Sequence, residues 1–398
     1  MRQSKLILPV IVISQFCCTS LWFAGNGVIA DLSINFNLQD TALGHLTSAV
    51  QIGFIAGTLS FAIFTIADRF SPSKVFFVCA VIGAIFNLGT IYEGNNLISL
   101  LSLRFLTGFF LAGIYPIGMK IAADYFNKGL GKSLGFLVGA LVLGTAFPHL
   151  LKNMTESFSW KSVLIATSSI AVFGGLLMLT LVPDGPYRKA SKRLNLLAFS
   201  QVFRNSKFRS SAFGYFGHMW ELYAFWAFVP IIITNYNAKH AQIDFNISLW
   251  SFLIIAIGGL ACVLGGYLSQ KLGTKRTAFL SLLFSFSCCL ISPLIFSVEN
   301  DLVFVSFLLF WGIVVIADSP LLSTLVAQNA PNEIKGTALT IVNCIGFSIT
   351  IVSIQLINVM QTMTGSNSIY IILALGPLLG LIALRKDIKR HPSKSKLP

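Results

Sequence analysis

Long apolar runs separated by short polar stretches cover almost the whole chain. A membrane-spanning helix needs about 20 predominantly apolar residues, and the pattern predicts twelve such helices. Their expected ranges are 6–30, 43–66, 74–92, 97–119, 132–151, 160–182, 211–235, 246–269, 277–298, 302–327, 336–359 and 367–384. The sequence therefore predicts an all-α integral membrane protein with twelve transmembrane helices.

The longest polar interruption, residues 183–210, lies between the sixth and seventh predicted helices. We expect an N-terminal six-helix bundle at 1–182, a basic cytoplasmic linker at 183–210, and a C-terminal six-helix bundle with a short cytoplasmic tail at 211–398. Weak self-similarity favours two equivalent halves. At an offset of about half the chain, Gly57 matches Gly259 and Pro116 matches Pro320. The two bundles are therefore expected to be pseudo-symmetric.

Composition excludes a water-soluble globule, because 55% of the residues are hydrophobic and only 11% are charged. The seven cysteines lie in apolar runs without C-x-x-C spacing, which implies neither a disulfide framework nor a zinc site. Gly131-Lys132-Ser133 lacks the earlier glycine of a phosphate-binding loop, since Phe126 stands there. We find no catalytic constellation typical of an enzyme and expect no cofactor.

The chain carries a net charge of +14, and the position of the basic residues is more informative than their number. With the predicted helices in place, 24 of the 28 basic residues fall on one side, 3 on the other, and only Arg104 lies within a helix. This asymmetry predicts that the basic side is cytoplasmic. We therefore expect a multi-pass protein of the bacterial inner membrane with both termini in the cytoplasm, an uncleaved first helix, and no nucleic-acid partner. The cytoplasmic side includes Arg188, Lys189, Lys192, Arg193, Arg204, Lys207, Arg209 and the tail from Arg385 to Lys396.

Two short segments carry a resemblance to a known family. Ala67 to Lys74 resembles the loop signature G-x-x-x-D-R-x-G-R-R/K of the major facilitator superfamily, although Phe64 and Ser71 stand where the family has glycine. Arg104 to Gly108 resembles the R-x-x-x-G pattern of the fourth helix in that family. The resemblance implies two six-helix bundles around a central cavity, lined by the first, fourth, seventh and tenth helices. It also implies secondary transport by alternating access, without a defined substrate.

Four residues are candidates for gating. An acid and base cluster at helix ends can pair in one conformation and separate in another, which makes Asp68, Arg69 and Lys74 candidates for an inner gate. The alternative is that they serve only membrane topology. Asp318, two residues before Pro320, is the fourth candidate. It either pairs with a base at the inner gate or stabilises the inner end of its helix without moving.

Arg104 is the first of four candidate substrate-binding residues. A guanidinium at its depth costs at least about 2.5–3.5 kcal/mol unless water or an anion meets it. We therefore expect Arg104 to attract an anionic solute, with extension to the outer interface as the alternative. Trp22, Trp220 and Tyr223 are weaker candidates for the pocket.

Glu221 and His218 are candidates for proton coupling. They are three positions apart and are expected to share a helix face. Glu221 lies about 15 Å from the cytoplasmic helix end, where a carboxyl group is costly to ionise. Such a group suits a site that takes a proton from one side and releases it to the other. The alternatives are a static acid for Glu221 and a hydrogen-bonded packing residue for His218.

The predicted function is secondary active transport of a small polar solute, with an anion as one option, across the inner membrane by alternating access and proton-coupled import. We do not expect direct drive by ATP, because no cytoplasmic segment is long enough for a nucleotide-binding domain. Gly139 to Gly144 continues to Pro148 and departs from the antiporter signature of the fifth helix, which favours import. The alternative is efflux by antiport of a drug or metabolite such as a siderophore. The expected partners are the solute, protons and the lipid bilayer, and we expect a monomer.

Overall fold

A computed structural model describes residues 2–126, 130–155, 157–188, 199–240, 242, 244–331 and 334–385. All regular structure in these ranges is helical. In the first half the helices are α1 (Arg2–Thr19), α2 (Ala24–Gly27), α3 (Ile29–Asn35), α4 (Ala42–Ile63), α5 (Ile66–Arg69), α6 (Pro72–Gly89), α7 (Leu97–Leu111), α8 (Tyr115–Tyr125), α9 (Leu130–Met154) and α10 (Lys161–Leu181). In the second half they are α11 (Phe199–Arg204), α12 (Ser206–Lys239), α13 (Ile247–Leu272), α14 (Thr274–Ile295), α15 (Asp301–Ala317), α16 (Ser319–Asn329), α17 (Lys335–Thr364), the 3₁₀ helix η3 (Asn367–Ala374) and α18 (Leu375–Arg385).

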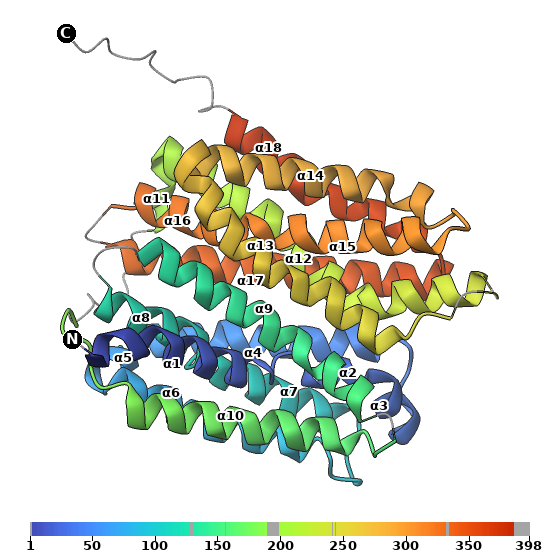
Figure 1. The fold of residues 1–398 in the computed structure, drawn as a ribbon, viewed down its shortest axis with the longest axis horizontal. Coiled ribbons are helices and arrows are strands. Elements are labelled where there is room, and N and C mark those ends of the chain that lie inside the picture. Colours follow the sequence, from blue (N-terminus) through green and yellow to red (C-terminus); the bar gives the residue numbers. More distant parts are fainter. Residues whose placement is uncertain are drawn as a thin grey trace.

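Eleven helices among the described residues are long and apolar enough to cross a membrane, and Leu6–Thr19 forms a shorter apolar helix. This agrees with the predicted all-α membrane fold. Figure 1 shows α1 to α10 gathered in one bundle and α12 to α18 in a second bundle beside it. Residues 189–198 of the predicted linker, with Lys189, Lys192 and Arg193, and the tail from 386 onward lie outside the described residues.

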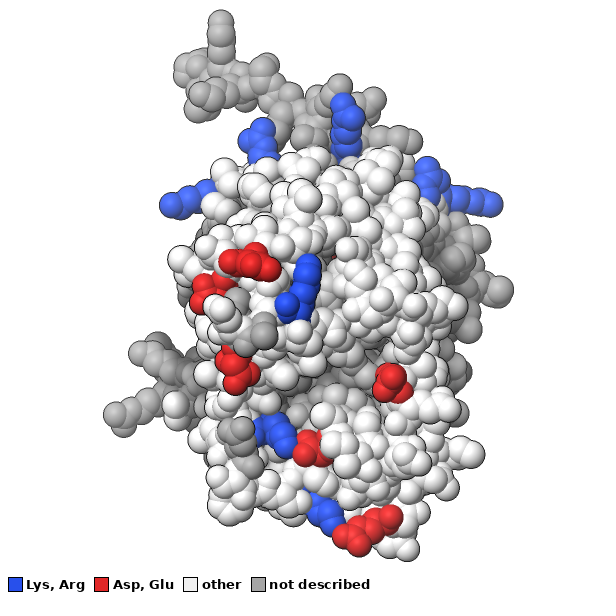
Figure 2. Space-filling model, turned by 90° about the vertical axis from the view of Figure 1, so that its right-hand side faces the viewer, with Lys and Arg blue, Asp and Glu red and all other residues white. Residues whose placement is uncertain are grey.

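We call the end of the molecule where α1 begins and α18 ends the basic face, and the opposite end the distal face. The positive-inside prediction makes the basic face the cytoplasmic one. Figure 2 shows the distal face, where acidic and basic side chains are interspersed. Two ion pairs lie there, Lys152 with Asp31 at 2.8 Å and Lys161 with Glu93 at 2.7 Å. The hydrogen bond from Lys161 and its positive charge hold the pKa of the Glu93 carboxyl below its ordinary value.

The two bundles meet along two helix pairs, α9 with α13 and α4 with α17. At the first contact, Gly139 and Gly259 approach each other's backbone. A Cβ built on either glycine would lie 3.1–3.2 Å from the carbonyl oxygen of the other. The absence of side chains at these two glycines therefore lets helices of the two halves come close.

One packing contact recurs in both halves. A Cβ on Gly108 of α7 would lie 2.0 Å from the Val50 carbonyl oxygen of α4, and a Cβ on Gly312 of α15 would lie 2.0 Å from the Ile254 carbonyl oxygen of α13. Both partners are shifted by 204 positions, which is the offset that also relates Pro116 to Pro320. The equivalent contact is consistent with the duplication inferred from sequence.

Four predicted helices are interrupted, and one of them, 367–384, begins as the 3₁₀ helix η3 and continues as α18. The expected helix 6–30 ends at Thr19, and Leu21 and Trp22 donate to the carbonyl groups three residues earlier instead of four. The hydroxyl groups of Thr19 and Ser20 donate to carbonyl groups of the same helix, which competes with its regular ladder. The expected helix 97–119 divides into α7 and α8 and continues to Tyr125, and 302–327 divides into α15 and α16 at Asp318. In each of these two cases a proline stands near the start of the second segment, where it lacks a backbone donor.

Candidate functional site

Arg104 lies across the break that follows α1. Its side chain is 1% exposed and does not extend to the distal surface. The guanidinium donates to the carbonyl oxygens of Leu21 (3.1 Å) and Trp22 (2.6 Å) and to Oδ1 of Asn87 (3.0 Å). All three acceptors are neutral. Arg104 therefore supplies donors to carbonyl groups that the interrupted helix leaves open, and its positive charge has no acidic partner in these three contacts.

Asn87 holds this guanidinium in place from α6. Its Nδ2 donates to the hydroxyl groups of Thr167 (3.2 Å) and Ser168 (2.9 Å) on α10, and the Asn87 side chain is fully buried. Arg104, Asn87 and these hydroxyl groups form a continuous network within the first half. The break in α1 is consequently fixed by side chains from three other helices.

Glu221 lies at the centre of a comparable network in the second half. Its Oε1 accepts from Ser285 Oγ (2.6 Å) and Cys289 Sγ (3.2 Å) on α14, and from Trp311 Nε1 (2.6 Å) on α15. The side chain is 1% exposed. Through these three hydrogen bonds to one carboxyl oxygen, α12 is joined to both α14 and α15. Glu221 is thus buried as expected, with partners on helices distant in the sequence.

His218 contacts Asp318 and not the partners of Glu221. Its Nδ1 lies 2.9 Å from Oδ1 of Asp318, at the junction between α15 and α16, and each side chain is 1% exposed. Within the described part of the chain, His218 Nε2 and both carboxyl oxygens of Asp318 have no hydrogen-bond partner. The structure therefore brings together His218 and Asp318, which the sequence had placed in separate roles. His218 and Glu221 do not contact the same groups.

An aromatic layer joins the two halves in the middle of the molecule. It consists of Trp22 and Phe54 from the first half and Tyr223 and Phe347 from the second. The ring centroids of Trp22 and Phe54 are 4.8 Å apart, those of Phe54 and Phe347 4.6 Å, and those of Trp22 and Tyr223 5.8 Å. Two of the predicted pocket residues, Trp22 and Tyr223, therefore meet at the interface. Trp220 instead donates to the Ile372 carbonyl at 3.2 Å, inside the second half.

Several buried polar groups on or next to α1, α4 and α12 lack partners among the described residues. The indole N–H groups of Trp22 and Trp226 are unpaired, as are both amide atoms of Gln15 and of Gln51. All four residues are fully buried. Leaving such groups unsatisfied is costly, so they mark positions for water or a polar solute. Sequence reasoning missed Gln15, Gln51 and Trp226, although an uncharged amide inside an apolar run was a usable signal.

The distal ends of the halves are held by a set of neutral hydrogen bonds, which we call the distal latch. The amide of Gln355 on α17 donates to the Gly44 carbonyl (2.9 Å) and to Ser48 Oγ (2.7 Å), and Asn358 Nδ2 donates to the Thr41 carbonyl (3.0 Å). A Cβ on Gly44 would lie 2.3 Å from Asn358 Cγ. The glycine therefore permits the close approach of α4 and α17.

The predicted gating residues of the first half lie on the basic face. Asp68 pairs with Lys120 at 3.2 Å, while Arg69 and Lys74 are exposed. Arg188 donates to the carbonyl oxygens of Asp68 (3.1 Å) and Phe70 (2.8 Å). These contacts tie the start of the linker to α5 and to the residue that follows it. They join elements of the first half and the linker, and the structure does not place Arg69 with Asp68 in an ion pair.

The Major Facilitator Superfamily family model matches residues 11–354. A 4-hydroxybenzoate transporter of Pseudomonas aeruginosa is 29% identical over 169 residues, covering 40% of this chain and 34% of that protein. A probable sulfoacetate transporter of Cupriavidus necator is 24% identical over 283 residues, covering 63% of each. A multi-drug resistance efflux pump homologue of Lactococcus lactis is 26% identical over 220 residues, covering 54% of this chain and 53% of that protein. These matches thus span from about a third to just under two thirds of the relatives' lengths.

The fold also resembles solved structures. That of a proton:xylose symporter superposes with a TM-score of 0.74 at 15% sequence identity and covers 97% of this chain and 96% of that one. That of a bacterial homologue of the human lysosomal transporter Spinster, in an inward-facing and unoccupied conformation, has a TM-score of 0.73 at 14% identity and covers 99% of both chains. Identities this low establish similarity of fold.

Proposed function

The chain belongs to the Major Facilitator Superfamily, and on that premise we propose that it imports a small organic anion together with protons by alternating access. Members of this superfamily are transporters rather than enzymes. The observation that carries the proton part of the proposal is the buried contact between His218 and Asp318. In this proposal the protein acts as a monomer in the cytoplasmic membrane, with both termini in the cytoplasm.

The His218–Asp318 pair is suited to hold a transferable proton. An ionised carboxylate without hydrogen-bond donors is strongly disfavoured in a protein interior. With Nδ1 and Oδ1 2.9 Å apart, the two side chains can share one proton, so that neither charge stands alone in the interior. His218 Nε2 and Asp318 Oδ2, which have no partner among the described residues, could then bind a water molecule that reaches the pair.

Glu221 has a different environment and, in this proposal, a different role. Its Oε1 already accepts from three donors, whereas neither carboxyl oxygen of Asp318 accepts a hydrogen bond from the described residues. A glutamine at position 221 retains an acceptor oxygen for the same donors. We therefore assign proton exchange to His218 and Asp318 and the positioning of α12 to Glu221. The variant Glu221→Gln becomes the matched control for Asp318→Asn.

The anionic character of the solute follows from the donors around the aromatic layer. An indole N–H can only donate, and those of Trp22 and Trp226 are buried without an acceptor in the described part of the chain. The charge of Arg104 lies directly behind Trp22, because the guanidinium binds the Trp22 carbonyl at 2.6 Å. A carboxylate or sulfonate arriving at this layer would satisfy the unpaired donors. The relatives named for 4-hydroxybenzoate and sulfoacetate support this class of solute.

The test uses purified protein in proteoliposomes with 4-hydroxybenzoate and sulfoacetate as labelled probes. We expect at least one of them to accumulate when the outside is acidic, and a protonophore to abolish that accumulation. Asp318→Asn should lose the proton-driven component while still exchanging solute across the membrane, and Glu221→Gln should keep both. Proton-driven accumulation by Asp318→Asn at the wild-type level would contradict the assignment.

Efflux of a drug or metabolite is the second candidate, favoured by the similarity to the Lactococcus lactis efflux pump homologue and by the aromatic layer. The two directions are distinguished by the orientation of the vesicles. Import predicts that right-side-out vesicles accumulate solute under an inward proton gradient. Accumulation confined to inside-out vesicles, with protons leaving in exchange, would favour efflux.

A further inference from the structure

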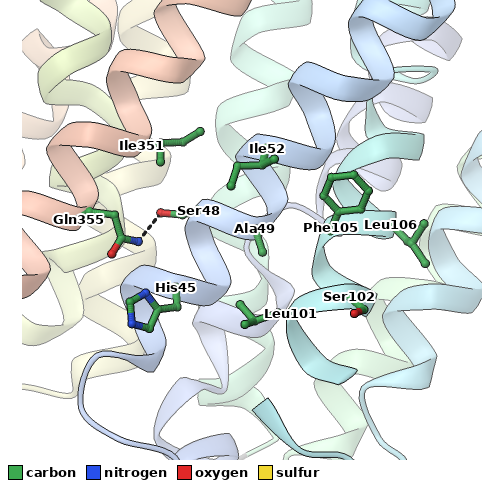
Figure 3. A pocket seen from close by; sticks show the side chains of 10 residues that line it. All are labelled: His45, Ser48, Ala49, Ile52, Leu101, Ser102, Phe105, Leu106, Ile351 and Gln355. Atoms are coloured by element: carbon green, nitrogen blue, oxygen red, sulfur yellow. Dashed lines mark hydrogen bonds between the residues drawn. The ribbon is translucent and has the colours of Figure 1, made fainter. Parts of the chain in front are cut away.

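A groove runs along the lipid-facing side of the molecule where the two halves meet near the distal face. It has a volume of about 660 Å³, which is in the range of small-ligand sites. Figure 3 shows its walls, which come from α4, α7 and α17. The lining consists of His45, Ser48, Ala49, Ile52, Leu101, Ser102, Phe105, Leu106, Ile351 and Gln355. The groove therefore includes part of the distal latch.

The depth of the groove matches one leaflet of a bilayer. His45 lies three residues from the distal end of α4, or about 5 Å, and Ile351 lies thirteen residues from the distal end of α17, or about 20 Å. The groove thus extends over about 15 Å, and half of a hydrocarbon core of about 30 Å has the same length. Since all three walls are membrane-spanning helices, the medium beside it is the hydrocarbon of the distal leaflet.

The chemistry of the lining changes along that depth. Six of the ten residues are apolar, among them Ile52, Phe105 and Ile351 in the deeper part. His45 and Ser102 lie toward the distal end, at the level of lipid esters and headgroups. The remaining polar pair is internally satisfied, because Gln355 donates to Ser48 at 2.7 Å, as the dashed line in Figure 3 shows. This arrangement fits an amphiphile with its polar end at the surface and an apolar chain pointing inward.

We propose that one acyl chain of a phospholipid from the distal leaflet binds in this groove and stabilises the conformation in which α4 and α17 are in contact. The chain would touch α4 and α7 of the first half and α17 of the second at the same time. Moving α17 away from α4 breaks the Ser48–Gln355 bond and removes one wall of the groove. A ligand that binds one conformation better shifts the population toward it, so the bound chain opposes opening at the distal face.

The first experiment maps lipid contacts in the wild-type protein. The protein is placed in nanodiscs with a phospholipid that carries a photoactivatable diazirine within its acyl chain, and the labelled peptides are identified by mass spectrometry. We expect labelling at 45–52, 101–106 and 351–355 to exceed that around Leu260 and Leu264 on α13, which are each 66% exposed. Equal labelling of the two regions would overturn the proposal.

The second experiment fills the groove. Ala49→Phe should reduce labelling of the groove and leave α13 unchanged, and Leu260→Trp is the matched control on an open lipid-facing surface. Ile52→Trp, at a site that is 47% exposed, serves the same purpose if Ala49→Phe folds poorly. Unaltered groove labelling in a folded filling variant would contradict the assigned site.

The third experiment measures the conformational effect. Spin labels at Asp40→Cys and Thr364→Cys report the distance between the distal ends of α4 and α17. Cys344 is replaced by serine, since the other native cysteines are buried. A folded groove-filling variant should show a larger population with separated labels, and Leu260→Trp should match the unfilled protein. Identical distance distributions would refute the stabilising role. None of these measurements depends on the transported solute or on proton coupling.

Discussion

Replacing Arg104 by methionine removes the guanidinium and keeps a side chain of similar length. Three acceptors then lose their donor: the carbonyl groups of Leu21 and Trp22 and the side chain of Asn87. Hydrogen bonds to a charged group contribute about 1.5–3 kcal/mol each. The protein no longer bears a desolvation cost of about 2.5–3.5 kcal/mol for the buried guanidinium. The difference predicts a net loss of about 1–6.5 kcal/mol in unfolding free energy.

The assay follows thermal unfolding in detergent with a dye that fluoresces on reaction with thiols, because six of the seven cysteines are buried in the folded protein. Unfolding of such a protein is often irreversible, so the apparent Tm is compared at one scan rate. We expect Arg104→Met to lower the apparent Tm by several degrees. Arg69→Met, which removes an exposed arginine, is the control and should leave the Tm unchanged.

Two further measurements test the reasoning. Asn87→Ala should also destabilise the protein, and its effect should not add to that of Arg104→Met because the two residues share a bond. Arg104→Lys keeps the charge, but the compact ammonium group lacks the planar fork of donors that reaches all three acceptors, so its Tm should fall as well. An unchanged Tm in Arg104→Met, with a selective loss of affinity for the anion, would refute the structural role and restore the direct solute contact expected from sequence.

Other predictions concern the remaining contacts. Gly44→Ala should separate α4 from α17 and increase the reactivity of thiols placed at the distal ends, whereas Gly336→Ala, which has open space around it, should not. Trp311→Phe removes the donor that lies 2.6 Å from Glu221 and should lower the unfolding free energy by about 1–3 kcal/mol, measured with the same thiol dye. Gly108→Ala should prevent normal folding, seen as loss of monodisperse protein after solubilisation, because its Cβ would meet the Val50 carbonyl at 2.0 Å.

The sequence predicted the helices well because the length of an apolar run is set by bilayer thickness. It also identified Arg104 and Glu221 as buried charges. It could not give their partners, since Asn87, Ser285, Cys289 and Trp311 are neutral residues on helices far away in the chain. His218 and Glu221 are about 60° apart around their helix at 3.6 residues per turn. Because of this difference His218 points toward the junction of α15 and α16, whereas Glu221 points toward α14 and α15. Nearness in sequence therefore did not predict a shared contact.

The pattern of the polar contacts has a mechanical consequence. Arg104 and Glu221 are each bonded inside their own bundle, whereas the distal latch consists of three neutral hydrogen bonds between bundles. At about 0.5–1.5 kcal/mol each, those three bonds amount to a barrier that thermal motion can cross. We therefore expect these distal hydrogen bonds to break before the buried polar networks inside each bundle do. The two bundles of such a transporter can move relative to each other without unfolding, because the hydrogen bonds within each bundle are not the ones that must break at the interface.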